Sequence, residues 1–384
     1  MEKLVLKGDL FLRNSILKDA YIIINDGKIE EITNEYEGHY EDLSGMVIAP
    51  GLFDTHIHGY GGYDVMDLKE NSLLEISNSI VKMGVTSFLA TTLTSAKNDL
   101  DTAVSLVKKQ SESISGAKLK GIFLEGPFFT EKYKGAQNAN YMTAPSVERI
   151  KELQELSGGL IKKVAIAPEY ENSVDFIKEM RKMNIYVALG HSDASYDMAR
   201  ASVEAGANIF VHTYNGMSGL HHREPGMVGA AMHLKEAYSE LICDGHHVHP
   251  VSAQILMDIK GREKIALITD CMMAGGMKEG QYMLGEYEVK VAEGQARLES
   301  GSLAGSVLNL NDGVRNVVEW GAATIHEAVK MASYVPAKSL GLEDEIGTLE
   351  KGRDADIIVM DKALNLFRTY VNGVLKYENP LFKA

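Results

Sequence analysis

The chain has 384 residues and a formal net charge of −14, with 45% hydrophobic and 24% charged residues. This length fits a large barrel with a smaller module, and the composition is typical of a globular protein with a sizeable core. The negative charge argues against nucleic acid as a partner, because such a field repels a polyanion on average. The two cysteines, Cys243 and Cys271, do not indicate a disulfide framework.

The two ends of the chain predict short strands. LVLKGDLFL, AYIIIN and KIEEI near the start are rich in β-branched residues, and Asn25-Asp26-Gly27 is a strong hairpin signal. ADIIVMD and TYVNGVLKY near the end have a similar strand-like composition, with a turn at Asn372-Gly373. We therefore expect one small β-sandwich domain built from residues 1–50 and 346–384.

The start of the chain, MEKLVLKGDLFLRN, lacks the apolar run of a secretory leader. No apolar run reaches the roughly 20 residues that a membrane-spanning helix needs. We expect a cytoplasmic protein without a membrane partner.

Residues 51–345 alternate helical and apolar segments. Helical patterns such as NSLLEISNSIVKMG and SVDFIKEMRKMN lead into the apolar runs TSFLATT, LKGIFLEG, VAIAPE, IYVALGHS, NIFVHTY, ELICDG and KIALITD. Seven or eight such runs predict a parallel sheet. Closed into a ring, the sheet is a (β/α)8 barrel with its chemistry where the strands end. An open, doubly wound sheet is the alternative.

Side chains that suit metal ions follow these runs. They are His56 and His58 after LFD, Glu125 after IFL, His191 after VALG, His212 after IFV, His246, His247 and His249 after LICDG, and Asp270 after ALIT. In a barrel these positions converge on one rim, and imidazole and carboxylate suit zinc, iron and other divalent ions. A single histidine or aspartate there is more often a satisfied polar group or a helix cap, so the whole set carries the prediction.

Several longer motifs resemble one enzyme family. They are APGLFDTHIHG at 49–59, LEGPFF at 124–129, KGAQN at 134–138, LGHSDA at 189–194, VHTYNGM at 211–217, HREPGMVGA at 222–230, DGHHVHP at 244–250, ITD at 268–270, LAGS at 303–306 and LEKGRDADIIVMD at 349–361. Over essentially its whole length the chain resembles the N-acetylglucosamine-6-phosphate deacetylases of the amidohydrolase superfamily. The resemblance implies metal-dependent hydrolysis of N-acetylglucosamine 6-phosphate to glucosamine 6-phosphate and acetate, in amino-sugar catabolism or cell-wall sugar recycling.

The same resemblance implies roles for the strand-end residues. It makes Glu125, His191 and His212 ligands of the principal ion, and the pair His56 and His58 the holders of a second ion in some members. One or two ions per subunit follow, with Zn or Fe first and Mn or Co as further choices. Asp270 matches the catalytic aspartate, which takes a proton from the attacking water and gives it to the departing amine.

The resemblance also implies how the sugar phosphate is bound. Gln137 stands where many members have a histidine that touches the acetyl carbonyl, and its amide can donate but carries no charge. Asn215 and the backbone of Gly216 match the phosphate-binding turn. Arg223 and His247 match residues that reach the phosphate from the neighbouring subunit of a homodimer, which would supply local donors for an anion despite the net charge.

Three alternatives stay open at this point. A cyclic-amide hydrolase such as a dihydroorotase or hydantoinase commonly carries a carboxylated lysine, whereas the corresponding strand end here carries Glu125. A deacetylase for the galactosamine epimer differs only in pocket shape. A non-catalytic scaffold on the same fold would be expected to have lost its ligands, and this chain keeps them.

Overall fold

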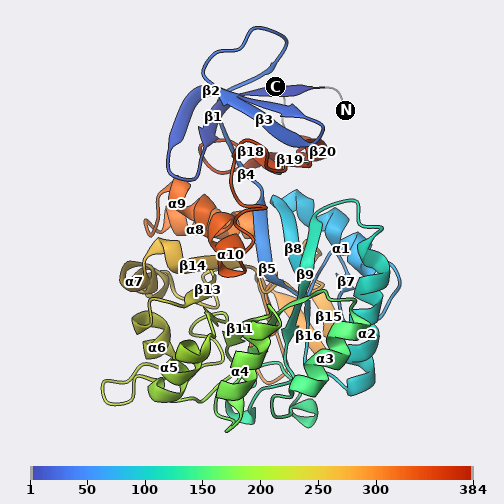
Figure 1. Ribbon diagram of the computed structural model, residues 1–384, viewed down its shortest axis with the longest axis vertical. Helices are drawn as coiled ribbons and strands as arrows, with labels where there is room; N and C mark the ends of the chain where they lie inside the picture. Colours follow the sequence, from blue (N-terminus) through green and yellow to red (C-terminus); the bar gives the residue numbers. More distant parts are fainter. Residues whose placement is uncertain (1–2, 382–384) are drawn as a thin grey trace.

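The computed structural model describes residues 3–381 and contains two main sheets (Figure 1). One sheet forms a barrel with helices around it, and the other lies above the barrel and joins strands from the first and the last part of the chain. Within the described residues, no helix has the length and apolar character that crossing a membrane requires.

The barrel sheet has eight strands in the order β14-β13-β12-β11-β10-β9-β8-β5, all paired in parallel with their neighbours. The strands are β5 (Leu52–Ile57), β8 (Val85–Thr92), β9 (Lys118–Glu125), β10 (Ile161–Ile166), β11 (Tyr186–Leu189), β12 (Ile209–Phe210), β13 (Tyr238–Ile242) and β14 (Ile265–Ile268). The two ends of the sheet meet where Ile57 bridges Cys271 and the amide of Asp270 donates to the carbonyl of His56 at 2.9 Å. The predicted (β/α)8 barrel is confirmed, and the open-sheet alternative is wrong.

Helices follow the barrel strands, as the alternating pattern predicts. They are α1 (Ser72–Ile80), α2 (Lys97–Ser111), α3 (Val147–Leu156), α4 (Ser173–Lys182), α5 (Tyr196–Ala205), α6 (Gly226–His233), α7 (Pro250–Lys260), α8 (Leu310–Glu319), α9 (Ile325–Met331) and α10 (Tyr334–Ser339), with short 3-10 turns η1 (Val81–Met83), η2 (Glu131–Tyr133), η3 (Ala139–Tyr141) and η4 (Arg262–Lys264). Helix α4 buries Phe176, Ile177 and Met180, a spacing that places all three on the face toward the core. The helical spacing of apolar residues in SVDFIKEMRKMN therefore reflects this buried face.

The second sheet joins both ends of the chain in the order β20-β19-β18-β4-β1-β2-β3. Its strands are β1 (Leu4–Phe11), β2 (Ile16–Asn25), β3 (Lys28–Thr33), β4 (Glu41–Pro50), β18 (Ile357–Met360), β19 (Leu366–Val371) and β20 (Val374–Glu378). Strand β4 pairs with β1 from the start of the chain and with β18 from its end, which unites the two segments. The predicted boundaries 1–50 and 346–384 stay a prediction, and residues 1–2 and 382–384 lie outside the described part.

Both hairpin turns predicted in this sheet adopt left-handed backbone conformations. Asp26 and Gly27 have φ values of 48° and 76°, and Asn372 and Gly373 have values of 50° and 70°. Two consecutive positive φ angles match the twist of the flanking strands, and Asn, Asp and Gly tolerate them best. Both turns therefore form at the positions that the sequence predicts.

The structure adds two small antiparallel sheets that the sequence analysis did not predict. One joins β15 (Gly280–Leu284), β16 (Tyr287–Ala292) and β17 (Gln295–Arg297), and the other joins β6 (Gly59–Tyr60) and β7 (Tyr63–Asp64). The larger one lies between β14 and α8 in the chain and buries Val289 and Val291 on one face. The alternation of apolar and polar residues in YEVKVAEGQAR indicates strands, but the barrel pattern led us to expect helices in this region.

Candidate metal centre

Glu125, the last residue of β9, lies at the centre of a buried cluster. Its Oε1 atom lies 3.2 Å from Nε2 of His191 and 3.1 Å from Nε2 of His212. The two imidazole Nε2 atoms are 3.1 Å apart. Each histidine follows its barrel strand closely, β11 and β12 respectively, so parallel strands bring the three side chains together.

The outer nitrogens of these two histidines are held by the backbone. Nδ1 of His191 lies 3.0 Å from the carbonyl oxygen of Tyr133, and Nδ1 of His212 lies 3.1 Å from that of Asn215. A carbonyl accepts a hydrogen bond from a protonated Nδ1, and in that tautomer Nε2 keeps a free lone pair. The geometry therefore directs both lone pairs toward Glu125.

A second group of side chains lies on the other side of Glu125. Nε2 of His58 is 3.2 Å from Oε2 of Glu125 and 3.2 Å from Oδ1 of Asp270. Nε2 of His56 is 3.4 Å from Oε1 of Glu125 and 3.3 Å from the same Asp270 oxygen. Glu125 thus belongs to both groups, and Asp270 joins the second.

These residues fit divalent ions. Two trios, His56-His58-Glu125 and Glu125-His191-His212, each have ligand atoms within 4.8 Å of one another, and all five residues are buried. Nε2 of His56 is also buried without a hydrogen-bond partner, an arrangement that a cation would satisfy. Imidazole nitrogens with carboxylate oxygens are a donor set that zinc and iron accept.

The electrostatics of the cluster agree with this fit. Burial lowers the pKa of His56, but the carboxylates of Asp270 and Glu125 outweigh burial and raise the pKa to about 9. Burial raises the pKa of Glu125, yet the surrounding histidines hold it well below its usual range. The site thus favours positive charge among its carboxylates, which a metal ion supplies.

A cavity of about 340 Å³ opens over the cluster. The predicted site residues that line it are His58, Glu125, Gln137, His191, His212, Asn215, Gly216, His247 and Asp270. His56 lies beneath them, fully buried. Arg223 does not line the cavity of its own chain: it is exposed, and its guanidinium donates to Nε2 of His222 at 2.8 Å.

Two predicted substrate contacts have neighbours that the sequence did not reveal. The side-chain amide nitrogen of Gln137 donates to Oε2 of Glu125 at 2.8 Å, and its oxygen accepts from the backbone amide of Thr94 at 2.9 Å. Nδ1 of His247 lies 2.6 Å from Oδ2 of Asp244, and its ring lines the cavity of its own chain. Gln137 therefore also positions the shared carboxylate.

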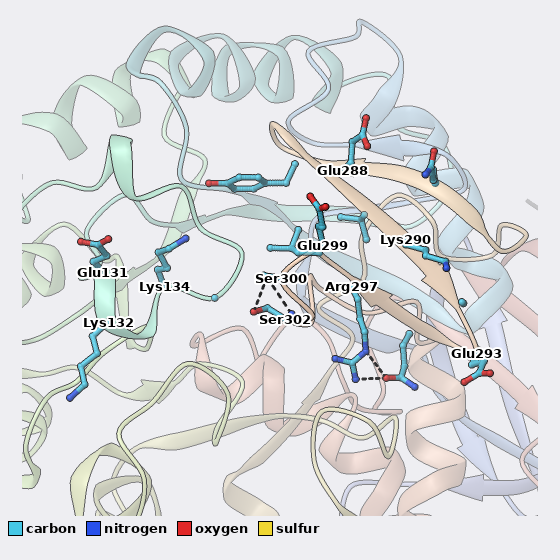
Figure 2. Close-up of a pocket in the computed structure, with 17 residues that line it drawn as sticks. Glu131, Lys132, Lys134, Glu288, Lys290, Glu293, Arg297, Glu299, Ser300 and Ser302 are labelled. Atoms are coloured by element: carbon cyan, nitrogen blue, oxygen red, sulfur yellow. Dashed lines mark hydrogen bonds between the residues drawn. The ribbon is translucent and has the colours of Figure 1, made fainter.

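A larger cavity of about 1260 Å³ borders this one, and the two share Gly135, Arg297 and Ser302 among their lining residues. Figure 2 shows the larger cavity. One wall is the loop that carries Lys132 and Lys134, and the opposite wall belongs to β16, β17 and the segment that follows. Of the described residues that line the inner cavity, Arg297 alone is a lysine or arginine, and Gln295 holds its guanidinium at 3.0 and 2.5 Å. Arg297 could not be predicted as a cavity residue from the sequence, because it belongs to the β15–β17 sheet, which the barrel pattern does not predict.

Two further charged residues escaped the sequence analysis. Lys163 of β10 and Glu240 of β13 lie inside the barrel, 0% and 1% exposed, and form an ion pair. Their signal was a charge within a mainly apolar strand, Lys163 in IKKVAI and Glu240 in YSELI. Nζ of Lys163 is bound to a carboxylate and is not free to bridge metal ions, which separates this site from the carboxylated-lysine alternative.

A parallel barrel with imidazoles and carboxylates gathered at the carboxyl ends of its strands defines the class of metal-dependent barrel hydrolases. Comparison with known proteins agrees: residues 47–381 match the model of the amidohydrolase family. The chain belongs to the amidohydrolase family, in the branch that includes the deacetylases of N-acetylated hexosamine 6-phosphates.

Three relatives illustrate this placement. The N-acetylglucosamine-6-phosphate deacetylase of Vibrio furnissii is 39% identical over 366 residues, covering 94% of this chain and 92% of the relative. The N-acetylgalactosamine-6-phosphate deacetylase of Escherichia coli O157:H7 is 40% identical over 360 residues, covering 94% and 95%. The structure of a mutant N-acetyl-D-glucosamine-6-phosphate deacetylase from Mycobacterium smegmatis, in complex with N-acetyl-D-glucosamine-6-phosphate, has a TM-score of 0.93 at 27% identity, covering 98% of this chain and all of that one.

Proposed function

We propose that this protein hydrolyses the acetamide of N-acetylglucosamine 6-phosphate and releases acetate and glucosamine 6-phosphate. The observation that carries the proposal is one cavity in which Glu125, His191 and His212 lie beside Asp270. The similarity to deacetylases of this substrate over more than nine-tenths of the chain supports it.

The reaction needs an activated water, a polarised carbonyl and a proton for the leaving nitrogen. A divalent ion, Zn or Fe first, supplies Lewis-acid activation when held by Glu125, His191 and His212. Asp270 lines the cavity with its carboxylate, whose pKa the nearby histidines lower despite burial, so it is ionised and ready to accept a proton. We assign Asp270 the transfer of that proton from the water to the departing amine.

Recognition of the phosphate is assigned to residues around one side of the cavity. Asn215 and the amide of Gly216 line it and offer donors. His247, which the family resemblance implies for the neighbouring subunit's phosphate, lines the cavity of its own chain instead, and we assign it to the phosphate there. Arg223 is assigned to the active site of a partner subunit, since it is exposed and does not line the cavity of its own chain. A guanidinium there would supply a local positive charge for the phosphate, although the chain as a whole carries a net charge of −14.

An exposed apolar surface supports the homodimer that this assignment requires. Val251, Ile255 and Ile259 recur every four residues along α7 and are 56%, 45% and 46% exposed. Leu220, close to Arg223 in the chain, is 58% exposed. An exposed apolar stripe such as the one on α7 favours coverage by another protein surface, so we assign it to the dimer. We also keep the cytoplasm as the proposed location.

The galactosamine epimer is a second candidate substrate. The observation that favours it is 40% identity to an N-acetylgalactosamine-6-phosphate deacetylase, as high as the identity to the glucosamine enzymes. Acetate release from N-acetylglucosamine, N-acetylgalactosamine and their 6-phosphates, with elemental analysis of the same sample, decides between the two. Absence of acetate from both phosphorylated sugars in a metal-loaded sample would refute the proposed function.

A further inference from the structure

A buried ion pair lies inside the barrel, beneath the candidate metal centre. Lys163 and Glu240 come from strands β10 and β13, and their side chains are 0% and 2% exposed. Nζ of Lys163 also donates to the carbonyl oxygen of Thr55 at 3.4 Å and lies 3.6 Å from the ring centroid of Phe123. Burying two charges costs their hydration free energy. An ion pair at this depth is therefore expected to have a specific role in the protein.

The second oxygen of Glu240 faces a metal-ligand candidate. Oε2 lies 3.4 Å from Nδ1 of His56, while Oε1 accepts from the hydroxyl of Thr55 at 3.2 Å. With a proton on Nδ1 directed at Glu240, Nε2 of His56 points its lone pair at the space between Glu125 and Asp270. Phe123 packs edge-on against the same ring, with centroids 4.9 Å apart.

His56 differs in this respect from the other histidines of the cluster. The Nδ1 atoms of His191 and His212 face neutral backbone carbonyls, and Nδ1 of His58 has no hydrogen-bond partner. A carboxylate behind an imidazole fixes its tautomer and ring orientation and increases its strength as a ligand. Glu240 therefore supports one member of the second trio specifically.

We propose that Glu240, held in place by Lys163, is the positioning residue that makes His56 a ligand for a second divalent ion. The proposal rests on the proposed function only in taking the cluster to be a metal centre. Glu240 reaches neither the cavity nor the reacting atoms, and it acts through His56. Lys163 keeps Glu240 ionised and stationary, since an unpaired carboxylate at this depth would favour its neutral form.

Paired variants test whether Glu240 positions His56 or only fills space inside the barrel. Glu240→Gln with Lys163→Met removes both charges but keeps an acceptor for Nδ1 of His56. Glu240→Leu with Lys163→Met also removes both charges, and it removes the acceptor. Glu240→Asp is a milder third variant, which keeps both charges and shortens the side chain, so that the carboxylate is withdrawn from His56.

The measurement is titration of chelator-treated protein with Zn²⁺ by calorimetry, with elemental analysis after dialysis. We expect two ions per chain in the unaltered protein and in the glutamine double variant. In the leucine double variant and in Glu240→Asp, we expect the second ion to bind about 10- to 100-fold more weakly, with the first unchanged. Circular dichroism and thermal unfolding confirm that each variant is folded.

The other outcomes overturn the proposal. These are a single ion in the unaltered protein, equal loss of the second ion in both double variants, or an unchanged second ion in the leucine variant and in Glu240→Asp. Acetate release is measured on the same samples. An unaltered protein that binds two ions and releases no acetate would refute the proposed function and leave this inference standing.

Discussion

The Nε2 atom of His58 lies 3.2 Å from Oδ1 of Asp270, a contact that joins the ends of the first and last barrel strands. The same nitrogen lies 3.2 Å from Oε2 of Glu125. His58 therefore stands between the carboxylate shared by both trios and the carboxylate assigned to proton transfer. Variants of the two carboxylates should separate metal binding from catalysis.

Replacing Glu125 should remove metal. Because Glu125 belongs to both trios, Glu125→Ala is expected to lose both ions, and elemental analysis of the purified protein measures this. His249→Ala is the matched control, since the His249 side chain accepts from the amide of Val251 at the start of α7 and belongs to neither trio. Full metal content in Glu125→Ala would contradict the assignment.

Replacing Asp270 should spare metal and remove activity. Asp270→Asn keeps the size of the side chain but cannot accept the proton, so kcat is expected to fall at least about 100-fold. Steady-state acetate release, together with metal content equal to that of the unaltered protein, checks this. Turnover close to the unaltered rate would exclude Asp270 from proton transfer.

A methyl group at Gly216 should disturb the first trio. Gly216 has φ +61°, and a Cβ there would lie 3.0 Å from Nδ1 of His191 and 3.2 Å from the carbonyl oxygen of Tyr133, the two atoms whose contact orients the ring. Gly216→Ala is expected to weaken metal binding about 10-fold or more. Gly219→Ala is the control, because nothing lies within 4 Å of its Cβ position. Equal metal affinity in the two variants would speak against this coupling.

Arg223→Ala should impair recognition of the phosphate more than the chemistry. Loss of a hydrogen bond to a charged group, worth about 1.5–3 kcal/mol, predicts a KM for the phosphorylated sugar raised about 10- to 100-fold, with kcat little changed. Arg200→Ala is a suitable control, since Arg200 is exposed and pairs with Asp197 at 3.2 Å. If Arg223→Ala discriminates phosphorylated from free sugar as well as the unaltered protein, the assignment is wrong.

Lys260 should make stability depend on pH. Burial is the main cause that lowers its pKa from 10.5 to about 7, and its Nζ lies 2.7 and 2.6 Å from the carbonyl oxygens of Ala231 and Leu234. Between these two pKa values the unfolded chain holds a proton that the folded protein lacks, so the free energy of unfolding rises with pH, by at most about 1.4 kcal/mol per unit.

Lys260→Met removes this dependence. Denaturant unfolding at pH 7 and pH 10 should therefore show a steeper gain in stability for the unaltered protein than for the variant. Parallel pH profiles would show that Lys260 stays charged in the folded state.

The sequence by itself determined the barrel and the candidate metal-binding side chains at its rim. Apolar runs record which segments are buried on both faces, and the residue that ends each run must lie at the same rim once the strands are parallel. Glu125, His191 and His212 could thus be predicted to meet without coordinates. The hairpin turns at Asp26-Gly27 and Asn372-Gly373 were also readable, because their backbone demands particular residues.

Tertiary structure alone decided which distant residues support that site. The contact of Glu240 with His56, the bond from Gln137 to Glu125 and the place of Arg297 in the cavity all depend on how the barrel closes and on where the β15–β17 sheet folds back. No local periodicity encodes such pairs, because their members lie on different strands or loops. The sequence pattern determines on which face of its strand or helix a side chain lies. Only the assembled barrel determines which residue lies next to it.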